Sequence, residues 1–168
     1  GKNFGYFSLE NNTSVAREPI SADWDITFTK YMTVILAPEP TPYGVTGVVL
    51  NKNVTAIKAS GVNVNTVDYN NYTFQSEINT IGWEWKTFAG TWTVEDSLAF
   101  FVKRSNGDIW KVIFTGFGGS STGNYIFSKE LVYEASTGVH DIEGVSALSV
   151  YPNPAHNQVT VIYSYDKT

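Results

Sequence analysis

Two aromatic segments joined by a tight turn, between Leu98 and Phe117, constrain the fold of this chain most. In the first segment Leu98, Phe100 and Val102 alternate with Ala99, Phe101 and Lys103, and in the second Trp110, Val112 and Phe114 alternate with Lys111 and Thr115. A period of two places alternate side chains on opposite faces of a strand. Between the segments, Ser105–Asp108 reads Ser-Asn-Gly-Asp, and Asn-Gly tolerates the positive φ that hairpin turns require. An isolated hairpin is only marginally stable in water, so this one must pack on further sheet.

The rest of the chain supplies more segments of the same kind. Strand-like patterns occupy residues 4–9, 23–36, 44–50, 82–94 and 125–133. We expect one helical turn at Val54–Ser60, irregular structure at 61–80 and an exposed loop without ladder pairing at Pro38, Pro40 and Pro42, because proline lacks the N–H that a ladder needs. The pattern predicts an all-β fold, either an antiparallel sandwich or an open barrel.

Composition limits the partners and the chemistry of the chain. The net charge is −5, which argues against a nucleic-acid or anionic-membrane partner, since these favour basic surfaces. The absence of cysteine excludes disulfides, thiolate metal sites and cysteine nucleophiles. No run of 18 apolar residues is present, so we expect no transmembrane segment. Because the sequence starts at Gly1 without a signal peptide, we expect a mature or trimmed product.

The domain organisation is predicted from a change of pattern after Tyr133. We expect a β-domain at residues 1–134, a small polar linker at 135–147 and a further β segment at 148–168. In this last segment a short strand meets Pro152-Asn153-Pro154, and an alternating strand with Val159 and Val161 on one face follows. A strand and a fragment cannot bury an apolar face alone, so the tail looks like the start of a second β-domain that is cut short.

The motif in this tail resembles the start of the C-terminal sorting domain, an Ig-like fold, of proteins exported by type IX secretion. The residues that carry the resemblance, and that would form the sorting signal, are Tyr151, Pro152, Asn153, Pro154 and Ala155, followed by Gln158-Val159-Thr160-Val161. The resemblance covers only about the last 20 residues. It implies that the type IX machinery is a partner of the tail. It also implies secretion, or display on the outer-membrane surface, in a Gram-negative bacterium of the Bacteroidetes type.

The body of the chain resembles the HmuY family of secreted haem-binding proteins. Motifs in the family's order spread over residues 4–133: Tyr6–Leu9, Trp24–Ile26, Gly82-Trp83, Phe100–Val102, Asn106-Gly107, Lys111-Val112 and Phe114-Thr115. The resemblance implies an HmuY-like antiparallel sandwich or open barrel. It also implies a secreted or surface-exposed protein that binds a small molecule, with haem or another porphyrin as the candidate ligand and cofactor.

The family's iron ligands are not matched in this chain. Family members typically hold haem iron through a pair of His, yet residues 44–97 contain no His, Met or Cys, and the corresponding position falls near Thr87 or Phe88. Haem iron takes His, Met, Cys or Tyr, which leaves Tyr69 and Tyr72 as local candidates. The candidate cofactor-binding residues are therefore Tyr69, Tyr72, Trp85 and Phe88, and no metal site is predicted. Met32 is expected in the core, and His140 and His156 lie in the linker and tail.

Two other functions are weighed against the binding protein. A surface adhesin or carbohydrate-binding module would use exposed tryptophans, with Trp83 and Trp85 on either side of Glu84, although such a pair on one strand face more often belongs to a core. An enzyme would need paired carboxylates such as Asp23 and Asp25, which more often lie on the solvated face of a strand. Gly116–Gly123 lacks the pattern of a phosphate-binding loop, and no nucleophile elbow is present. We therefore expect a protein that is not an enzyme.

Overall fold

The computed structural model describes residues 4–36, 38–135, 145–151, 157–158 and 160–165. The chain divides into two compact units, residues 1–135 and 136–168. The described residues form antiparallel strands and a single 3-10 turn, η1 (Tyr69–Asn71), so the all-β prediction is confirmed. In the first unit the strands are β1 (Tyr6–Ser8), β2 (Thr13–Val15), β3 (Ile26–Leu36), β4 (Pro40–Leu50), β5 (Thr55–Ser60), β6 (Lys86–Phe88), β7 (Trp92–Val94), β8 (Leu98–Lys103), β9 (Ile109–Phe117) and β10 (Tyr125–Tyr133).

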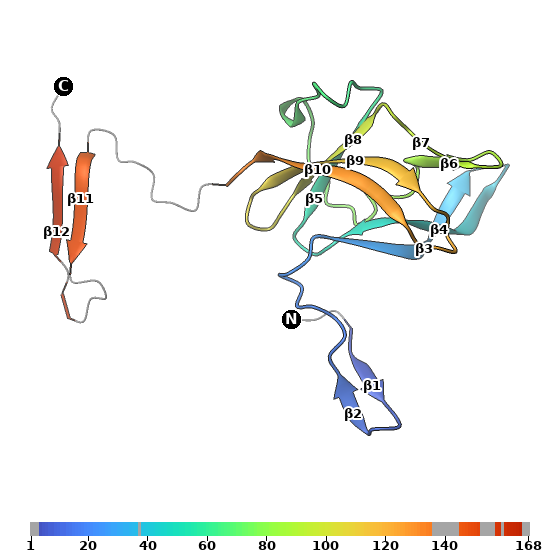
Figure 1. The fold of residues 1–168 in the computed structure, drawn as a ribbon, viewed down its shortest axis with the longest axis horizontal. Helices are drawn as coiled ribbons and strands as arrows, with labels where there is room; N and C mark the ends of the chain where they lie inside the picture. Colours follow the sequence, from blue (N-terminus) through green and yellow to red (C-terminus); the bar gives the residue numbers. More distant parts are fainter. Residues whose placement is uncertain (1–3, 37, 136–144, 152–156, 159, 166–168) are drawn as a thin grey trace. The chain divides into compact units, whose positions relative to one another are not determined.

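A four-stranded sheet in the order β10-β9-β8-β5 is the centre of the first unit, and the β3–β4 hairpin packs on one of its faces (Figure 1). The core between them contains Val48 and Leu50 of β4 together with Phe100 of β8 and Phe114 of β9. Phe28 of β3 also contacts the sheet, with its ring centre 4.5 Å from that of Tyr125. The aromatic face that the sequence predicts is thus covered by a second layer of strands.

The other face of the sheet is buried as well. Ile57, Phe101 and Ile109 form a second core cluster on that face. The irregular segment predicted at 61–80 covers it, and the Tyr69 ring centre lies 5.8 Å from that of Phe101. Both alternating sets of β8 therefore lie in cores, and only its last residue, Lys103, is exposed.

The predicted hairpin between β8 and β9 is present with the predicted turn. Gly107 has a φ of +97°, a conformation in which a side chain is strained. The backbone N–H of Arg104 donates to the Asp108 carbonyl oxygen at 2.9 Å, which closes the turn. The strands pair with Phe100 opposite Val112 and Val102 opposite Trp110.

Three predictions about β3, β4 and β5 are wrong. Residues 55–60 form β5 instead of a helical turn, because the segment pairs along its whole length with β8 and tertiary pairing outweighs weak local preference. Pro40 and Pro42 lie within β4, opposite Leu36 and Val34. The β3–β4 sheet has two strands, so proline can stand where no ladder hydrogen bond is needed. Met32 is 67% exposed and does not belong to the core.

The second unit contains two strands in its described residues. β11 (Val145–Tyr151) pairs antiparallel with β12 (Thr160–Tyr165). Tyr151, the first residue of the predicted sorting signal, ends β11, whereas Pro152, Asn153, Pro154 and Ala155 lie outside the described residues. The predicted linker at 135–147 lies mostly outside them too, and β11 begins within its last three residues.

Candidate functional site

The candidate site is a cavity of about 480 Å³, called the aromatic cavity, at the part of the β3–β4 hairpin that carries Ile35 and Tyr43. Residues from β3, β4, the segment before β6, β6, β7 and the loop after β9 line it, among them Tyr43, Thr46, Trp83, Lys86, Phe88 and Trp92. Its volume falls in the range of small-molecule sites, which are mostly apolar with a few polar groups. Phe88 is 61% exposed and Trp92 38% exposed, so two rings are accessible at its mouth.

A close approach of two backbones holds the segment before β6 against β4. The Val48 N–H donates to the Gly82 carbonyl oxygen at 2.9 Å, and the Gly82 N–H returns a bond to the Val48 carbonyl at 3.1 Å. A Cβ at Gly47 would lie only 2.6 Å from that Gly82 oxygen. The missing side chain therefore allows the contact and fixes where Trp83 begins the wall of the cavity.

Trp85 anchors the same segment in the core. Its ring stacks on Phe114 with centres 4.0 Å apart, and its indole N–H donates to the Gly82 carbonyl at 3.2 Å. With 1% of its surface exposed, Trp85 cannot contact a ligand in the cavity. Trp83 and Trp85 precede β6 in a bend and turn, so the predicted strand through both is wrong, whereas the core position of Trp85 is confirmed.

Lys86, the first residue of β6, places a buried ammonium group at the aromatic cavity. The residue is 5% exposed. Its Nζ lies 4.4 Å from the Trp85 ring centre, 4.8 Å from that of Phe117 and 5.8 Å from that of Trp92. It donates to the carbonyl oxygens of Thr46 at 2.5 Å and, more weakly, of Trp83 at 3.4 Å. Burial lowers the pKa of Lys86 to about 8.

No carboxylate balances this charge within the part of the chain that the structure describes. The ion pairs there join Lys58 to Glu84, Arg104 to Asp25 and Asp108, and Lys111 to Glu130, and none includes Lys86. Rings and carbonyl dipoles stabilise the ammonium only in part, because an ion in a low-dielectric site loses its hydration. Lys86 is therefore a buried cation that faces a cavity and lacks a counter-ion among the described residues.

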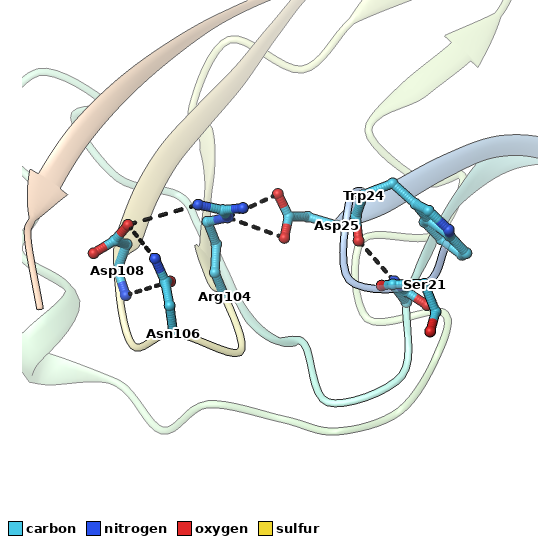
Figure 2. Close-up of polar contacts among 7 residues, drawn as sticks. Ser21, Trp24, Asp25, Arg104, Asn106 and Asp108 are labelled. Carbon is cyan, nitrogen blue, oxygen red and sulfur yellow. Dashed lines mark hydrogen bonds and ion pairs between the residues drawn. The ribbon is translucent and has the colours of Figure 1, made fainter. Parts of the chain in front are cut away.

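At a second cavity, of about 420 Å³, the basic side chain has carboxylate partners, unlike Lys86. Asp25 and Arg104 line it, and the Arg104 Nε–H contacts both carboxylate oxygens of Asp25 at 3.1 and 3.0 Å. Figure 2 shows Arg104 between Asp25 and Asp108. The pKa of the Asp108 carboxyl is lowered mainly by a hydrogen bond from the Ala135 N–H and, to a smaller extent, by one from the Asn106 side chain. Arg104 is thus paired on both sides, and this cluster fastens the start of β3 to the β8–β9 turn.

The carboxylate pair weighed from the sequence does not share this cavity. Asp25 lines it and is bound to Arg104, whereas Asp23 is exposed and is not among the lining residues. Glu84 is 63% exposed at its side chain and pairs with Lys58 at 2.6 Å, so it does not point to a sugar site between two tryptophans. Across the described residues, no group of three or more His, Cys, Asp or Glu could hold a metal ion.

The four predicted cofactor-binding residues are not brought together. Tyr69 and Tyr72 line a separate shallow cavity of about 310 Å³ beside η1, with Phe74 and Lys103. Trp85 lies in the core, and only Phe88 lines the aromatic cavity. Sequence reasoning missed Lys86, and it placed Trp83 with Trp85 on one strand face that more often belongs to a core, whereas Trp83 lines the aromatic cavity. A lysine at the start of an alternating segment reads as a solvated residue, so only its burial identifies it.

The residues at the aromatic cavity do not fit haem that is held through iron. Haem iron takes His, Met, Cys or Tyr side chains, and of these types only Tyr43 lines the cavity. Tyr69 and Tyr72 lie in the other, smaller cavity. The residues that line the aromatic cavity therefore do not supply a pair of axial ligands.

Comparisons with protein-family models, with curated proteins and with solved structures found no match for this chain. Within the part of the chain that the structure describes, no helix has the length and apolar character to cross a membrane.

Proposed function

We propose that this protein is a secreted or surface-exposed binding protein of the HmuY-like kind, and that the aromatic cavity holds a small molecule with a flat ring system. The observation that carries the proposal is the set of rings around one cavity of about 480 Å³, with Phe88 and Trp92 accessible and 5.1 Å apart between ring centres. Aromatic side chains combine a large apolar area with rigid geometry, which suits the face of a planar ligand.

Phe88 supports the connection with the family resemblance. The position that corresponds to a family iron ligand falls near Thr87 or Phe88, and both residues line the aromatic cavity. In this chain Thr87 carries a hydroxyl group and Phe88 a phenyl group, and neither group ligates haem iron. The proposal is therefore stacking of a ring system, with a porphyrin as one member of the class, and not coordination of its iron.

Titration of the full chain with protoporphyrin IX and with haemin tests this function. We expect saturable quenching of tryptophan fluorescence by protoporphyrin, weakened about tenfold or more by Phe88→Ala, since a lost stacking ring costs roughly 0.5–1.5 kcal/mol in addition to the apolar area that it no longer buries. Tyr72→Ala, in the other cavity, is the matched control and should leave the affinity unchanged. Haemin spectra in both oxidation states show whether the iron acquires protein ligands. No saturable binding of either compound, or equal loss in the two variants, would overturn the proposal.

A carbohydrate-binding module is the second candidate, because Trp92 and Phe88 also form an exposed aromatic pair that suits the face of a sugar ring. Retention on glycan columns that Trp92→Ala abolishes would support it. Trp85 is too deeply buried to serve in that test, although the sequence suggested it. Retention by glycans combined with no response to protoporphyrin would replace the first candidate by the second.

The tail supports the proposed location. We propose that residues 148–168, which begin within β11 and include the Tyr151–Ala155 motif, bind the type IX secretion machinery. Deleting them should leave the protein in the periplasm of an expressing bacterium that has this machinery. Folding of the remaining chain is checked by near-UV circular dichroism, and normal surface delivery of a folded deletion would refute the assignment.

A further inference from the structure

The charge at the aromatic cavity restricts the class of ligand, and the argument rests on the proposed binding function. Lys86 is 5% exposed and lines the cavity from β6. An ammonium group has three donor hydrogens. Its bond to the Thr46 carbonyl at 2.5 Å uses one, and the contact with the Trp83 carbonyl at 3.4 Å is long.

The surroundings of Lys86 lack negative charge in the described part of the chain. The nearest groups are the rings of Trp85, Phe117 and Trp92 and neutral carbonyls. Glu84, its close neighbour in sequence, is paired with Lys58. A buried cation without an ion-pair partner is costly, and an anion that enters the cavity would remove that cost.

The other basic side chains near cavities do not share this state. Arg104 lies between Asp25 and Asp108, and Lys52 and Lys103, which line two further cavities, are exposed to solvent. Lys129 stands over the Trp110 ring at 4.7 Å, but it is exposed to solvent, which screens its charge. Lys86 alone among these five basic residues combines burial, a cavity and no carboxylate partner within the described residues.

We propose that the ligand of the aromatic cavity is a ring-bearing carboxylic acid, whose carboxylate pairs with the Lys86 ammonium while its ring system packs on Trp83, Phe88 and Trp92. The rings select a flat apolar body, and the lysine selects the acid over a neutral analogue of the same shape. The carboxylate supplies the counter-ion that the described residues do not provide. A charge-assisted hydrogen bond in this buried position is stronger than one between neutral groups.

Two probes of one shape, 2-naphthoate and 2-naphthamide, separate the charge from the ring. Binding of each to the full chain is measured by isothermal titration calorimetry at pH 7. We expect naphthoate to bind about tenfold or more tightly than naphthamide, since only the carboxylate brings an opposite charge to the buried ammonium. Equal affinities of the two probes would overturn the inference and leave the binding cavity standing.

Variants at Lys86 assign the preference to its charge. Lys86→Gln keeps a donor for the Thr46 carbonyl and removes the charge, and Lys86→Met removes both. We expect each to lose the preference for naphthoate over naphthamide, whereas Lys129→Met keeps it. Near-UV circular dichroism checks that each variant is folded. A preference retained in either folded Lys86 variant would overturn the inference.

Failure of the proposed function gives a different result. If neither naphthalene probe nor protoporphyrin binds the parent chain, the aromatic cavity is not a binding site, and the inference about its ligand falls with it. If both probes bind equally and Phe88→Ala weakens both, the function stands and only the carboxylate assignment is lost.

Discussion

The Nζ of Lys86 donates a hydrogen bond to the carbonyl oxygen of Thr46 at 2.5 Å, which joins β6 to a residue 40 positions earlier in β4. Both residues line the aromatic cavity. The bond holds the ammonium at the cavity but supplies no negative charge. The buried Lys86 ammonium is thus held in position by a backbone carbonyl group of β4.

Removing the Lys86 charge should change how stability depends on pH. Burial lowers the pKa of Lys86 in the folded chain to about 8, against 10.5 for an ordinary lysine. Between these values the unfolded chain binds more protons than the folded one, so the free energy of unfolding rises with pH. Relative to Lys86→Met, the parent should gain roughly 2 kcal/mol between pH 7.5 and 9.5. Urea unfolding followed by tryptophan fluorescence measures the difference.

The control for this prediction is Lys129→Met, at an exposed lysine, which should follow the parent over the same range. Burial raises the pKa of Tyr31, with the Glu84 charge as a smaller cause, and burial also raises that of Tyr125. These phenols favour unfolding as pH rises above about 10, so the comparison stops at pH 9.5. Parallel curves for the parent and Lys86→Met would contradict the prediction.

Trp85 should contribute far more to stability than Trp92. Trp85 is 1% exposed and stacks on Phe114, so Trp85→Ala should cost about 3–5 kcal/mol of unfolding free energy, through lost burial and the cavity left behind. Trp92 is 38% exposed, and Trp92→Ala should cost less than half as much. Thermal and urea unfolding of the two variants provide the measurement. Equal losses would mean that Trp85 is not the anchor of the segment before β6.

Gly47 should not tolerate a side chain, whereas Gly44 on the same strand should. A Cβ at Gly47 would lie 2.6 Å from the Gly82 carbonyl oxygen, and one at Gly44 would meet nothing closer than the Met32 Sδ at 3.7 Å. We expect Gly47→Ala to destabilise the chain by about 1–3 kcal/mol, as overpacking does, and to weaken binding in the aromatic cavity. Gly44→Ala is the matched control. Unchanged stability of Gly47→Ala would show that the two backbones separate at no cost.

The Arg104–Asp25 ion pair should contribute modestly to stability. Both side chains are 32% exposed, so solvent screens the pair. A double-mutant cycle with Arg104→Met and Asp25→Asn should give a coupling energy of about 0.5–1 kcal/mol. The coupling should shrink in 1 M salt, where exposed charges are screened within about 3 Å. A coupling near zero at low salt would remove the role of this pair in fastening β3 to the β8–β9 turn.

The sequence by itself determined the elements that depend only on residues close together in the chain. Alternation from Leu98 to Phe117 with Asn106-Gly107 between the halves predicted β8, β9 and their turn, because side-chain period and positive φ are properties of neighbouring residues. The last strand of the first unit, β10, and the irregular segment at 61–80 were predicted for the same reason. Val54–Ser60 was not, since its few apolar residues fit either a helical turn or a strand until β8 provides a partner.

Tertiary structure alone decided the candidate site. Alternation does not say which face of β8 meets which layer, and both of its faces are buried. Nor does it say that Lys86, which reads as a solvated residue, enters an aromatic enclosure and bonds to Thr46. The family resemblance suggested Tyr69 and Phe88 as residues of one pocket, yet they line different cavities. Burial and the pairing of charges depend on contacts between distant segments, and no local pattern encodes these contacts.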